Sequence, residues 1–300
     1  ARENYSHSVD GSARASPPLA SVVLPFLDEE RFLAEAIETV VAQSLSPWEL
    51  VLVDDGSTDE SAAIADAAAA ADPVRVRVLR HPHRRTEGLA ASRNVGLRAA
   101  NAGAIAFLDA DDRWDPDKLK IQLRLLADHP DVGMVAGPTT HVSEFDGSRT
   151  VQPVTTRAPC VFARGDFAAE IVRERLRMPP PPSAVMYRRG VLREVGGVPR
   201  GDSLYEDQRT FVAVNIAQPV LITDDPPLSS YARRPDSLFG SLENDPSTKA
   251  EQKRTFEWWV LRYCWRRGLI AWRIALLLGA HRVAHAVRRR RSLPGVHRHR

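Results

Sequence analysis

The chain has 300 residues, 43% of them hydrophobic and 26% charged, which suits one large globular domain or one domain with appendages. Its net charge of +3 is unevenly distributed: eleven arginines and no acidic residues follow Glu257, so the first 257 residues carry 30 basic and 38 acidic side chains. Such an acidic body argues against nucleic acid as a partner, because it would repel a phosphate backbone.

Up to residue 143 the chain alternates short apolar runs with segments of helical spacing. The predicted elements are, in order, strand 21–24, helix 30–44, strand 50–53, an alanine-rich helix ending near 71, strand 74–79, helix 89–101, strand 104–108, helix 115–128 and strand 132–135. This strand–helix alternation predicts an α/β fold with a mostly parallel sheet covered on both faces.

The pattern weakens between residues 144 and 182, where proline accumulates. We interpret this stretch as loop with one helix. The predicted elements from there on are helix 165–177, strand 183–187, helix 204–217, strand 219–223 and a tryptophan- and arginine-rich helix from 251. The resulting organisation is a disordered arm (1–19), a folded domain (20–250) and a basic helical extension (251–300).

The sequence also gives expectations about the cellular compartment. Cys160 and Cys264 are too far apart for a metal or redox motif, which is typical of a reducing cytoplasm. Residues 1–19 lack the apolar core of a signal peptide. The apolar run Ile274–Ala280 has 7 residues, whereas a membrane-spanning helix needs about 20. We therefore expect a cytoplasmic protein without a spanning helix.

An acidic turn follows the predicted strand 104–108. Asp109, Asp111 and Asp112 place three carboxylates within four positions, an arrangement that is costly without a cation. Mg²⁺ and Mn²⁺ prefer oxygen ligands and often bring a diphosphate with them. The carboxyl end of such a strand is also where open α/β sheets bind ligands. The turn therefore predicts a metal–phosphate site; the alternative is a solvated acidic turn.

A second acidic pair, Asp54 and Asp55, follows another apolar strand and should lie on the same rim of the sheet. These carboxylates could accept hydrogen bonds from a ribose or a base. Between the two acidic segments, Gly88 opens a helix that carries Arg93 and Asn94. Arg93 could meet a phosphate at the start of this helix, and Asn94 could orient a carboxylate. A single residue of these types is more often a surface ion-pair partner. The prediction of a binding site therefore depends on their shared location at one rim of the sheet.

A series of short motifs runs in order through residues 20–225. The motifs are Pro25, Glu29–Leu33 with Ala42–Ser44, Asp54–Asp59, Ser92–Leu97, Phe107–Asp112 with Trp114 and Pro116, Tyr187–Arg189 to Gly196–Gly197, and Tyr205–Gln208. This series resembles the family 2 glycosyltransferases. The resemblance implies the GT-A fold, a Rossmann-like mixed sheet flanked by helices. It also implies a nucleotide-sugar-binding half (20–143) and an acceptor half (144–250).

The resemblance implies a role for each matched residue. Asp207 would be the general base, and Asp111, with Asp112 as the alternative, would ligate Mn²⁺ or Mg²⁺ in the family's Asp-x-Asp motif. The nucleotide-sugar-binding residues would be Pro25, Phe26, Glu29, Asp54, Asp55, Arg93, Asp109 and Asp111, and the acceptor side would include Glu206 and Trp114.

The implied reaction moves a sugar from a nucleoside-diphosphate sugar, expected to be a UDP-sugar, to a hydroxyl of a glycan, lipid-linked or small-molecule acceptor, as in polysaccharide biosynthesis. It needs charge neutralisation on the leaving diphosphate, which a metal supplies, and a base near the acceptor hydroxyl. One base opposite the leaving group makes the displacement in-line, so the anomeric configuration should invert. A simpler interpretation of Glu206–Asp207 is a helix N-terminal cap.

Two segments depart from the family pattern. After the first strand, Leu27–Asp28 stands where the family has Tyr-Asn, so the stacking ring for the base would be lost or come from Phe26. Near residue 231 the family's Tyr-Arg-x-His becomes Tyr231–Arg234. Arg233 or Arg234 would then replace a phosphate-contacting histidine.

The basic extension leaves two interpretations open. Its tryptophans alternate with arginines at helical spacing, so residues 258–300 could lie on an anionic membrane surface and make the protein peripherally membrane-associated. Alternatively, its apolar stripe packs on the domain and its arginines are solvated, although the Arg288–Arg291 run is hard to explain by packing.

Two other functions are alternatives to sugar transfer. A nucleotidyltransferase would show a glycine-rich phosphate loop after the first strand, and Pro25–Asp28 is not such a loop. A catalytically silent nucleotide-sugar-binding or membrane-scaffold protein would have no need for Asp207 beside an intact metal motif.

Overall fold

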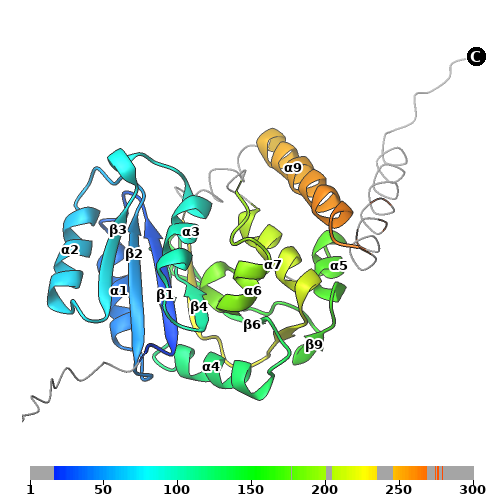
Figure 1. The fold of residues 1–300 in the computed structure, drawn as a ribbon, viewed down its shortest axis with the longest axis horizontal. Helices are drawn as coiled ribbons and strands as arrows, with labels where there is room; N and C mark the ends of the chain where they lie inside the picture. The colour runs from blue at the N-terminus through cyan, green and yellow to red at the C-terminus, as the bar shows by residue number, and fades with distance from the viewer. Residues whose placement is uncertain are drawn as a thin grey trace, which may run out of the picture.

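The computed structural model describes residues 17–176, 178–200, 205–234 and 246–268, together with positions 274, 276 and 279. The chain forms an eight-stranded sheet with helices packed on it (Figure 1), and a second, four-stranded sheet. The arm expected over residues 1–19 lies outside the described residues up to position 16, as do residues 281–300 with the Arg288–Arg291 run.

The large sheet has the order β3-β2-β1-β4-β10-β6-β11-β9. Four of its seven strand pairings are parallel, and β10 joins the two halves of the sheet through antiparallel pairings with β4 and β6. The sheet is therefore mixed and mostly parallel, as predicted. Its strands are β1 (Ala20–Phe26), β2 (Trp48–Asp54), β3 (Val76–Arg80), β4 (Ala104–Phe107), β6 (Met134–Ala136), β9 (Cys160–Phe162), β10 (Val185–Arg188) and β11 (Val220–Ile222).

Helices cover both faces of the sheet because its central strands are apolar on both sides. In β1, Val22 and Leu24 face one hydrophobic cluster and Val23 faces the other. The first face is covered by α1 (Leu33–Val41), α2 (Ser61–Ala71) and α4 (Lys118–Asp128), and the second by α3 (Leu89–Ala99), α5 (Asp166–Val172), α6 (Arg189–Glu194) and α7 (Glu206–Ala217). The short 3₁₀ turns are η1 (Pro82–Arg84) and η2 (Pro182–Ala184).

The second sheet was not predicted. It has the order β5-β12-β7-β8, from β5 (Arg113–Trp114), β7 (Thr139–Ser143), β8 (Arg149–Gln152) and β12 (Ser229–Arg233). The interpretation of residues 144–182 as loop with a helix to 177 is thus wrong in part, since β8 and β9 lie there and α5 ends at Val172. These strands are short and β8 is exposed, so they lack the apolar alternation that reveals a strand.

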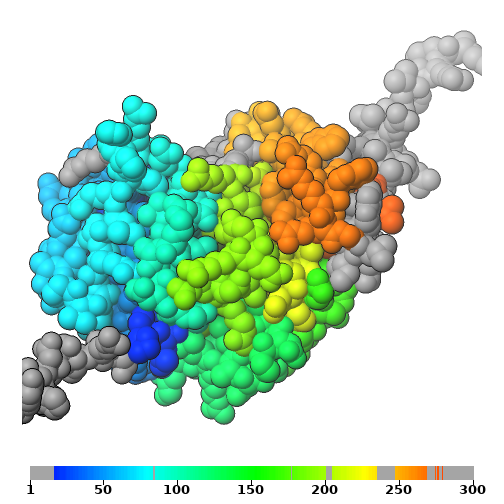
Figure 2. Space-filling model, in the orientation of Figure 1, coloured from blue at the N-terminus to red at the C-terminus, as the bar shows by residue number. Residues whose placement is uncertain are grey.

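The last described helix, α9 (Pro246–Trp265), packs against α7 at the surface of the molecule (Figure 2). Phe256, Val260 and Cys264, spaced by four residues, are at most 5% exposed and join the hydrophobic cluster of that face. This part of the extension therefore packs on the domain. Within the described residues, no helix has both the length and the apolarity needed to cross a membrane.

Candidate active site

The predicted site residues converge at the carboxyl ends of three adjacent strands. β1 lies between β2 and β4 and runs parallel to both. Asp54 ends β2, and Asp109 comes two residues after the end of β4. The two acidic segments therefore lie on one rim of the sheet, where open α/β sheets bind their ligands.

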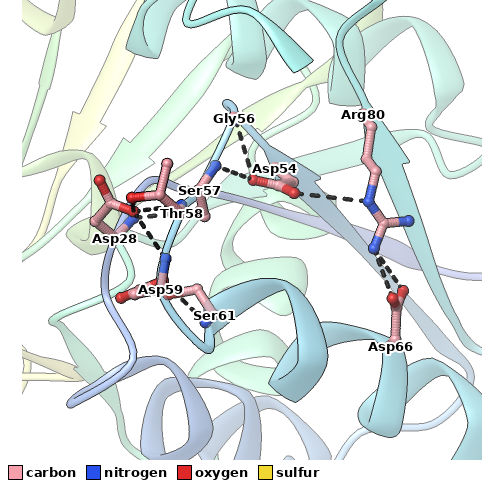
Figure 3. Close-up of polar contacts among 9 residues, drawn as sticks. All are labelled: Asp28, Asp54, Gly56, Ser57, Thr58, Asp59, Ser61, Asp66 and Arg80. Carbon is pink, nitrogen blue, oxygen red and sulfur yellow. Dashed lines mark hydrogen bonds and ion pairs between the residues drawn. The ribbon is translucent and has the colours of Figure 1, made fainter. Parts of the chain in front are cut away.

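Asp54 shapes the turn after β2. The residue is 2% exposed, and its Oδ1 accepts hydrogen bonds from the backbone amides of Gly56 (3.1 Å) and Ser57 (2.8 Å). Arg80 lies between Asp54 (3.6 Å) and Asp66 (2.7 Å), which ties β3 to this turn (Figure 3). Asp54 thus acts as a support for the site, and its carboxylate is used within the protein.

The exposed Asp28 connects the ends of β1 and β2. Its Oδ1 accepts hydrogen bonds from the backbone amide of Thr58 (2.7 Å) and from its hydroxyl (3.2 Å) (Figure 3). Asp28 adopts a φ of 52°, which aspartate tolerates better than most residues. The residue that departs from the family pattern therefore fixes the distance between the two loops.

Asp55 anchors the start of α3. Its Oδ1 accepts hydrogen bonds from the Glu87 amide (2.9 Å) and the Ser92 hydroxyl (3.0 Å), and its Oδ2 accepts one from the Gly88 amide (3.0 Å). Gly88 has a φ of 90°, a conformation that favours glycine. Asp55 is 5% exposed, so a contact with the nucleobase stays a prediction that requires this network to rearrange.

Arg93 joins the two halves of the chain. Its side chain is 2% exposed and donates to Asp109 Oδ1 (2.5 Å) and to Glu206 Oε1 (3.0 Å), at the start of α7. Burial opposes the charge on Arg93, but the carboxylates of Asp109 and Glu206 hold its pKa above the ordinary value. Neighbouring carboxylates take up the guanidinium of Arg93, so the phosphate contact stays a prediction that requires these ion pairs to rearrange.

Asn94 also has a different role from the predicted one. Its Nδ2 donates to the carbonyl oxygens of Ala90 (2.8 Å) and Val198 (2.7 Å), and its Oδ1 accepts from the Val198 amide (2.9 Å). It therefore fastens the segment after α6 to α3 and orients no carboxylate in this structure. Gly197 allows this approach, because a Cβ there would lie 2.3 Å from Asn94 Oδ1.

Asp207 lies beside Glu206 on the first turn of α7. Glu206 is 5% exposed and paired with Arg93, whereas Asp207 is half-buried. Burial, followed by the charge of Glu206, raises the pKa of Asp207 to about 8. A carboxyl group with such a pKa can accept a proton near neutral pH, which is what a general base requires.

The three carboxylates after β4 have different surroundings. Asp112 is 0% exposed and accepts a hydrogen bond from the Ala232 amide of β12 (3.1 Å). The Asp111 side chain is 16% exposed and the Asp109 side chain 22%. Burial, followed by the charge of Asp109, raises the pKa of Asp111. A cation at this turn would relieve the repulsion between the carboxylates. The partly exposed Asp109 and Asp111 are accessible to such a cation, and the choice of Asp111 or Asp112 as the metal ligand stays a prediction.

Arg234 already supplies a positive charge at this turn. It binds Asp111 Oδ2 through Nη2 (2.9 Å) and Nε (3.1 Å), and it also binds Glu29 Oε1 (2.9 Å). Its guanidinium carbon lies 4.5 Å from the centre of the Phe32 ring. Arg234, one of the two arginines proposed in place of the family's histidine, therefore contacts the acidic turn. In the described part of the chain, no three His, Cys, Asp or Glu side chains form a ready metal cage.

Comparison with known proteins identifies the fold and the family. The model of glycosyl transferase family 2 matches residues 21–196, more than half of the chain. The chain belongs to glycosyl transferase family 2. This membership supports a role in glycosyl transfer.

Curated relatives of this chain match parts of it. An uncharacterized glycosyltransferase of Nostoc sp. is 32% identical over 177 residues, covering 58% of this chain and 52% of that protein. The putative teichuronic acid biosynthesis glycosyltransferase TuaG of Bacillus subtilis is 35% identical over 109 residues, covering 36% of this chain and 42% of that protein. The first curated relatives are matched over about half of their length or less.

Solved structures share the fold. Residues 1–349 of S. aureus TarS, in complex with UDP-GlcNAc, superpose with a TM-score of 0.68 at 19% identity, covering 87% of this chain and 71% of that one. The mannosyltransferase PcManGT of Pyrobaculum calidifontis, in complex with GDP-Man and Mn²⁺, gives 0.54 at 18% identity, covering 91% and 76%. The predicted GT-A fold is thereby confirmed.

Two aromatic residues of this family 2 member are buried, and their contacts with donor and acceptor stay predictions. Phe26 is 3% exposed and packs in the hydrophobic cluster beneath α1, so it presents no ring to a base in this structure. Trp114 is 5% exposed, and its Nε1 donates to the Ser183 carbonyl (2.8 Å) in place of facing an acceptor. Pro25 is likewise buried within β1. Apolar burial explains all three positions, since each lies in a strand of a packed sheet.

Ser183 is a site residue that the sequence did not indicate. Its hydroxyl accepts a hydrogen bond from the Asp109 amide (3.1 Å), and its carbonyl oxygen accepts the one from Trp114. It is fully buried in η2. Because it lies 74 positions from Asp109, only the four-proline run before it could have suggested a fixed backbone there.

Proposed function

We propose that this chain transfers a sugar from a nucleoside-diphosphate sugar to an acceptor hydroxyl, with metal assistance and inversion at the anomeric carbon. The observation that carries the proposal is the chain of contacts Asp109–Arg93–Glu206. It connects the acidic turn after β4, on the donor side, to the first turn of α7, which bears Asp207. This connection supports the proposal that the acidic turn, which would bind the metal, and the base Asp207 are held in a fixed arrangement.

Asp109 and Asp111 are the proposed metal ligands, with donor oxygens and water completing the shell. When bound, the metal would act as a Lewis acid on the leaving diphosphate. The clustered, partly buried carboxylates support this assignment, since burial and the charge of Asp109 raise the pKa of Asp111. Arg234 would pass from Asp111 to a phosphate oxygen as the donor enters, because a guanidinium pairs equally well with either oxyanion.

Asp207 is the proposed base. The acceptor hydroxyl oxygen attacks the anomeric carbon while the bond from that carbon to the diphosphate oxygen breaks. The hydroxyl proton passes to the Asp207 carboxylate, and the negative charge stays on the released nucleoside diphosphate. Burial and the neighbouring charge of Glu206, which pairs with Arg93, raise the proton affinity of Asp207.

UDP is the proposed nucleotide, on the family resemblance and the fold shared with a protein solved with UDP-GlcNAc. The buried Phe26 leaves the base without a stacking ring from β1, so the base would be held by the backbone after β1 and by Asp55. The other fold relative was solved with GDP-Man, which makes GDP-sugars the informative comparison.

Thermal unfolding in the presence of UDP- and GDP-sugars, with and without Mn²⁺, tests the donor part of the proposal. A donor that binds the folded state raises the melting temperature by mass action. We expect stabilisation by a UDP-sugar that is larger with Mn²⁺ and absent in Asp111→Asn. Equal melting temperatures with all donors would overturn the proposal.

A further inference from the structure

Asp55 and His81 lie next to each other at the rim of the large sheet. They follow β2 and β3, a parallel pair in which Asp54 is opposite Arg80, so each lies one position beyond that pair. Successive side chains of a strand point to opposite faces. Asp54 and Arg80 approach each other on one face (Figure 3), whereas Asp55 and His81 both contact α3 on the other. The strand register therefore brings a histidine to the carboxylate that is predicted to contact the nucleobase.

Ser92, on the first turn of α3, connects these two side chains. Its hydroxyl donates to Asp55 Oδ1 (3.0 Å), and His81 Nε2 lies 2.8 Å from the hydroxyl oxygen and 3.3 Å from Asp55 Oδ1. A hydroxyl has one proton, which Ser92 gives to Asp55, so the hydrogen bond between His81 and Ser92 needs a proton on Nε2. All three residues are at most 8% exposed. His81 is therefore a hydrogen-bond donor within a buried cluster.

The two carboxylate oxygens of Asp55 are used unequally. Oδ1 accepts hydrogen bonds from the Ser92 hydroxyl and the Glu87 amide, and it also lies next to His81. Within the part of the chain that the structure describes, Oδ2 accepts one hydrogen bond, from the Gly88 amide (3.0 Å). A carboxylate oxygen has room for about two hydrogen bonds. Oδ1 is thus fully occupied, whereas Oδ2 can accept a further donor.

The groups around the two oxygens also differ in how firmly they are held. Ser92 and His81 are buried between the sheet and α3, whereas Gly88 is half-buried and follows the exposed Glu87. Apart from its neighbours in the chain, no atom of the described residues lies within 4 Å of where a Cβ of Gly88 would stand. The rearrangement that a nucleobase requires can therefore be confined to Oδ2 and the Gly88 amide, while Oδ1 stays in place.

The carboxylate determines the kind of base that fits, because an ionised carboxylate accepts hydrogen bonds and donates none. Uracil carries a hydrogen on ring nitrogen N3, and guanine carries one on N1. Cytosine and adenine have a lone pair at the corresponding nitrogen. A site that hydrogen-bonds a ring N–H rejects a base without it, because the buried acceptor is then left unpaired.

We propose that His81 is a positioning residue for the nucleobase: through Ser92 and Asp55 Oδ1, it aims Asp55 Oδ2 at the ring N–H of uracil or guanine. This role rests on the proposed sugar transfer, because it requires a nucleoside-diphosphate donor. It adds to that function the residue that allows the bases to be distinguished.

Titration calorimetry of the full chain with Mn²⁺ present tests this role. The probes are UDP and GDP, each compared with the analogue methylated at the ring N–H, N3-methyl-UDP or N1-methyl-GDP. His81→Leu removes the donor, His81→Gln keeps an N–H close to the position of Nε2, and Ser92→Ala removes the connecting hydroxyl. The control is His83→Asn, which removes an exposed imidazole from the same segment and tolerates the φ of 60° there.

We expect the wild type to bind UDP or GDP at least about tenfold more tightly than the methylated analogue, as for one hydrogen bond to a charged group. In His81→Leu and Ser92→Ala this preference should fall below about threefold, with the affinity for the analogue unchanged. The preference should persist in His81→Gln and in His83→Asn.

Three results would overturn the positioning role: no preference in the wild type, an unchanged preference in His81→Leu, or equal losses of affinity for the nucleotide and its analogue. Equal losses are what a merely structural role of His81 predicts. If neither UDP nor GDP binds to the wild type, the proposed function is contradicted, and the positioning role with it. Binding without a preference contradicts the positioning role alone.

Discussion

Arg93 offers a quantitative test of the contact chain that joins the two halves of the site. The substitution Arg93→Met removes the cation and leaves the side chains of Glu206, 6% exposed, and Asp109, 22% exposed, without it. Breaking a buried ion pair costs about 3–5 kcal/mol. Because water reaches part of Asp109, we expect the lower end, about 3 kcal/mol of unfolding free energy at pH 7.

The loss should depend on pH. Burial raises the pKa of Glu206 despite the neighbouring Arg93, so removing Arg93 raises it further. When the pKa of a carboxyl group is higher in the folded state than in the unfolded state, the folded state becomes more stable as the pH falls from the first pKa to the second. Arg93→Met should therefore recover stability on acidification between neutral pH and about pH 4.

Urea unfolding of a double-mutant cycle measures this coupling. In the Arg93→Met background, Glu206→Gln removes the stranded charge and should restore at least about 1 kcal/mol. Arg98→Met, on the exposed side of the same helix, should change stability by less than about 0.5 kcal/mol. Additive effects of the Arg93 and Glu206 substitutions, or a wild-type midpoint for Arg93→Met, would refute the reasoning.

Three further predictions concern the reacting groups. Asp207→Asn should bind donor but transfer sugar at least a hundredfold more slowly. In the wild type, kcat/KM should rise with pH through about 8, because the base must lose its proton. A flat pH profile would contradict the assignment of Asp207 as the base. Arg234→Ala should bind Mn²⁺ several-fold more tightly in the absence of donor, because Asp111 loses its competing partner. Electron paramagnetic resonance of free Mn²⁺ measures this affinity. Arg233→Ala, at an exposed position, should leave the affinity unchanged. Asp111→Asn should abolish Mn²⁺ binding and Asp112→Asn should preserve it, since Asp112 is fully buried; the reverse result would exchange their roles.

The sequence predicted the rim of the site because each acidic segment directly follows an apolar strand. Neighbouring parallel strands end at one edge, so Asp54 and Asp109 had to lie on the same side of the sheet. The positions of the long helices could be predicted for a similar reason, since α1 and α4 carry clear apolar stripes.

The sequence could not indicate how each side chain is used. Arg93 was predicted to meet a phosphate, yet the carboxylates of Asp109 and Glu206 hold it at 2% exposure. Phe26 and Trp114 looked available to a ligand, but their burial depends on what packs across the sheet. Arg234 lies more than a hundred positions from Asp111, and β12, which carries it there, is too short and polar to be recognised.

The released product tests the central claim most directly. Incubating the full chain with UDP- and GDP-sugars and analysing the nucleotide by chromatography distinguishes the possible reactions. Sugar transfer, or donor hydrolysis in the absence of acceptor, predicts Mn²⁺-dependent release of a nucleoside diphosphate that disappears in Asp111→Asn. Release of a nucleoside monophosphate, or no release from any donor with Mn²⁺ present, would contradict the account.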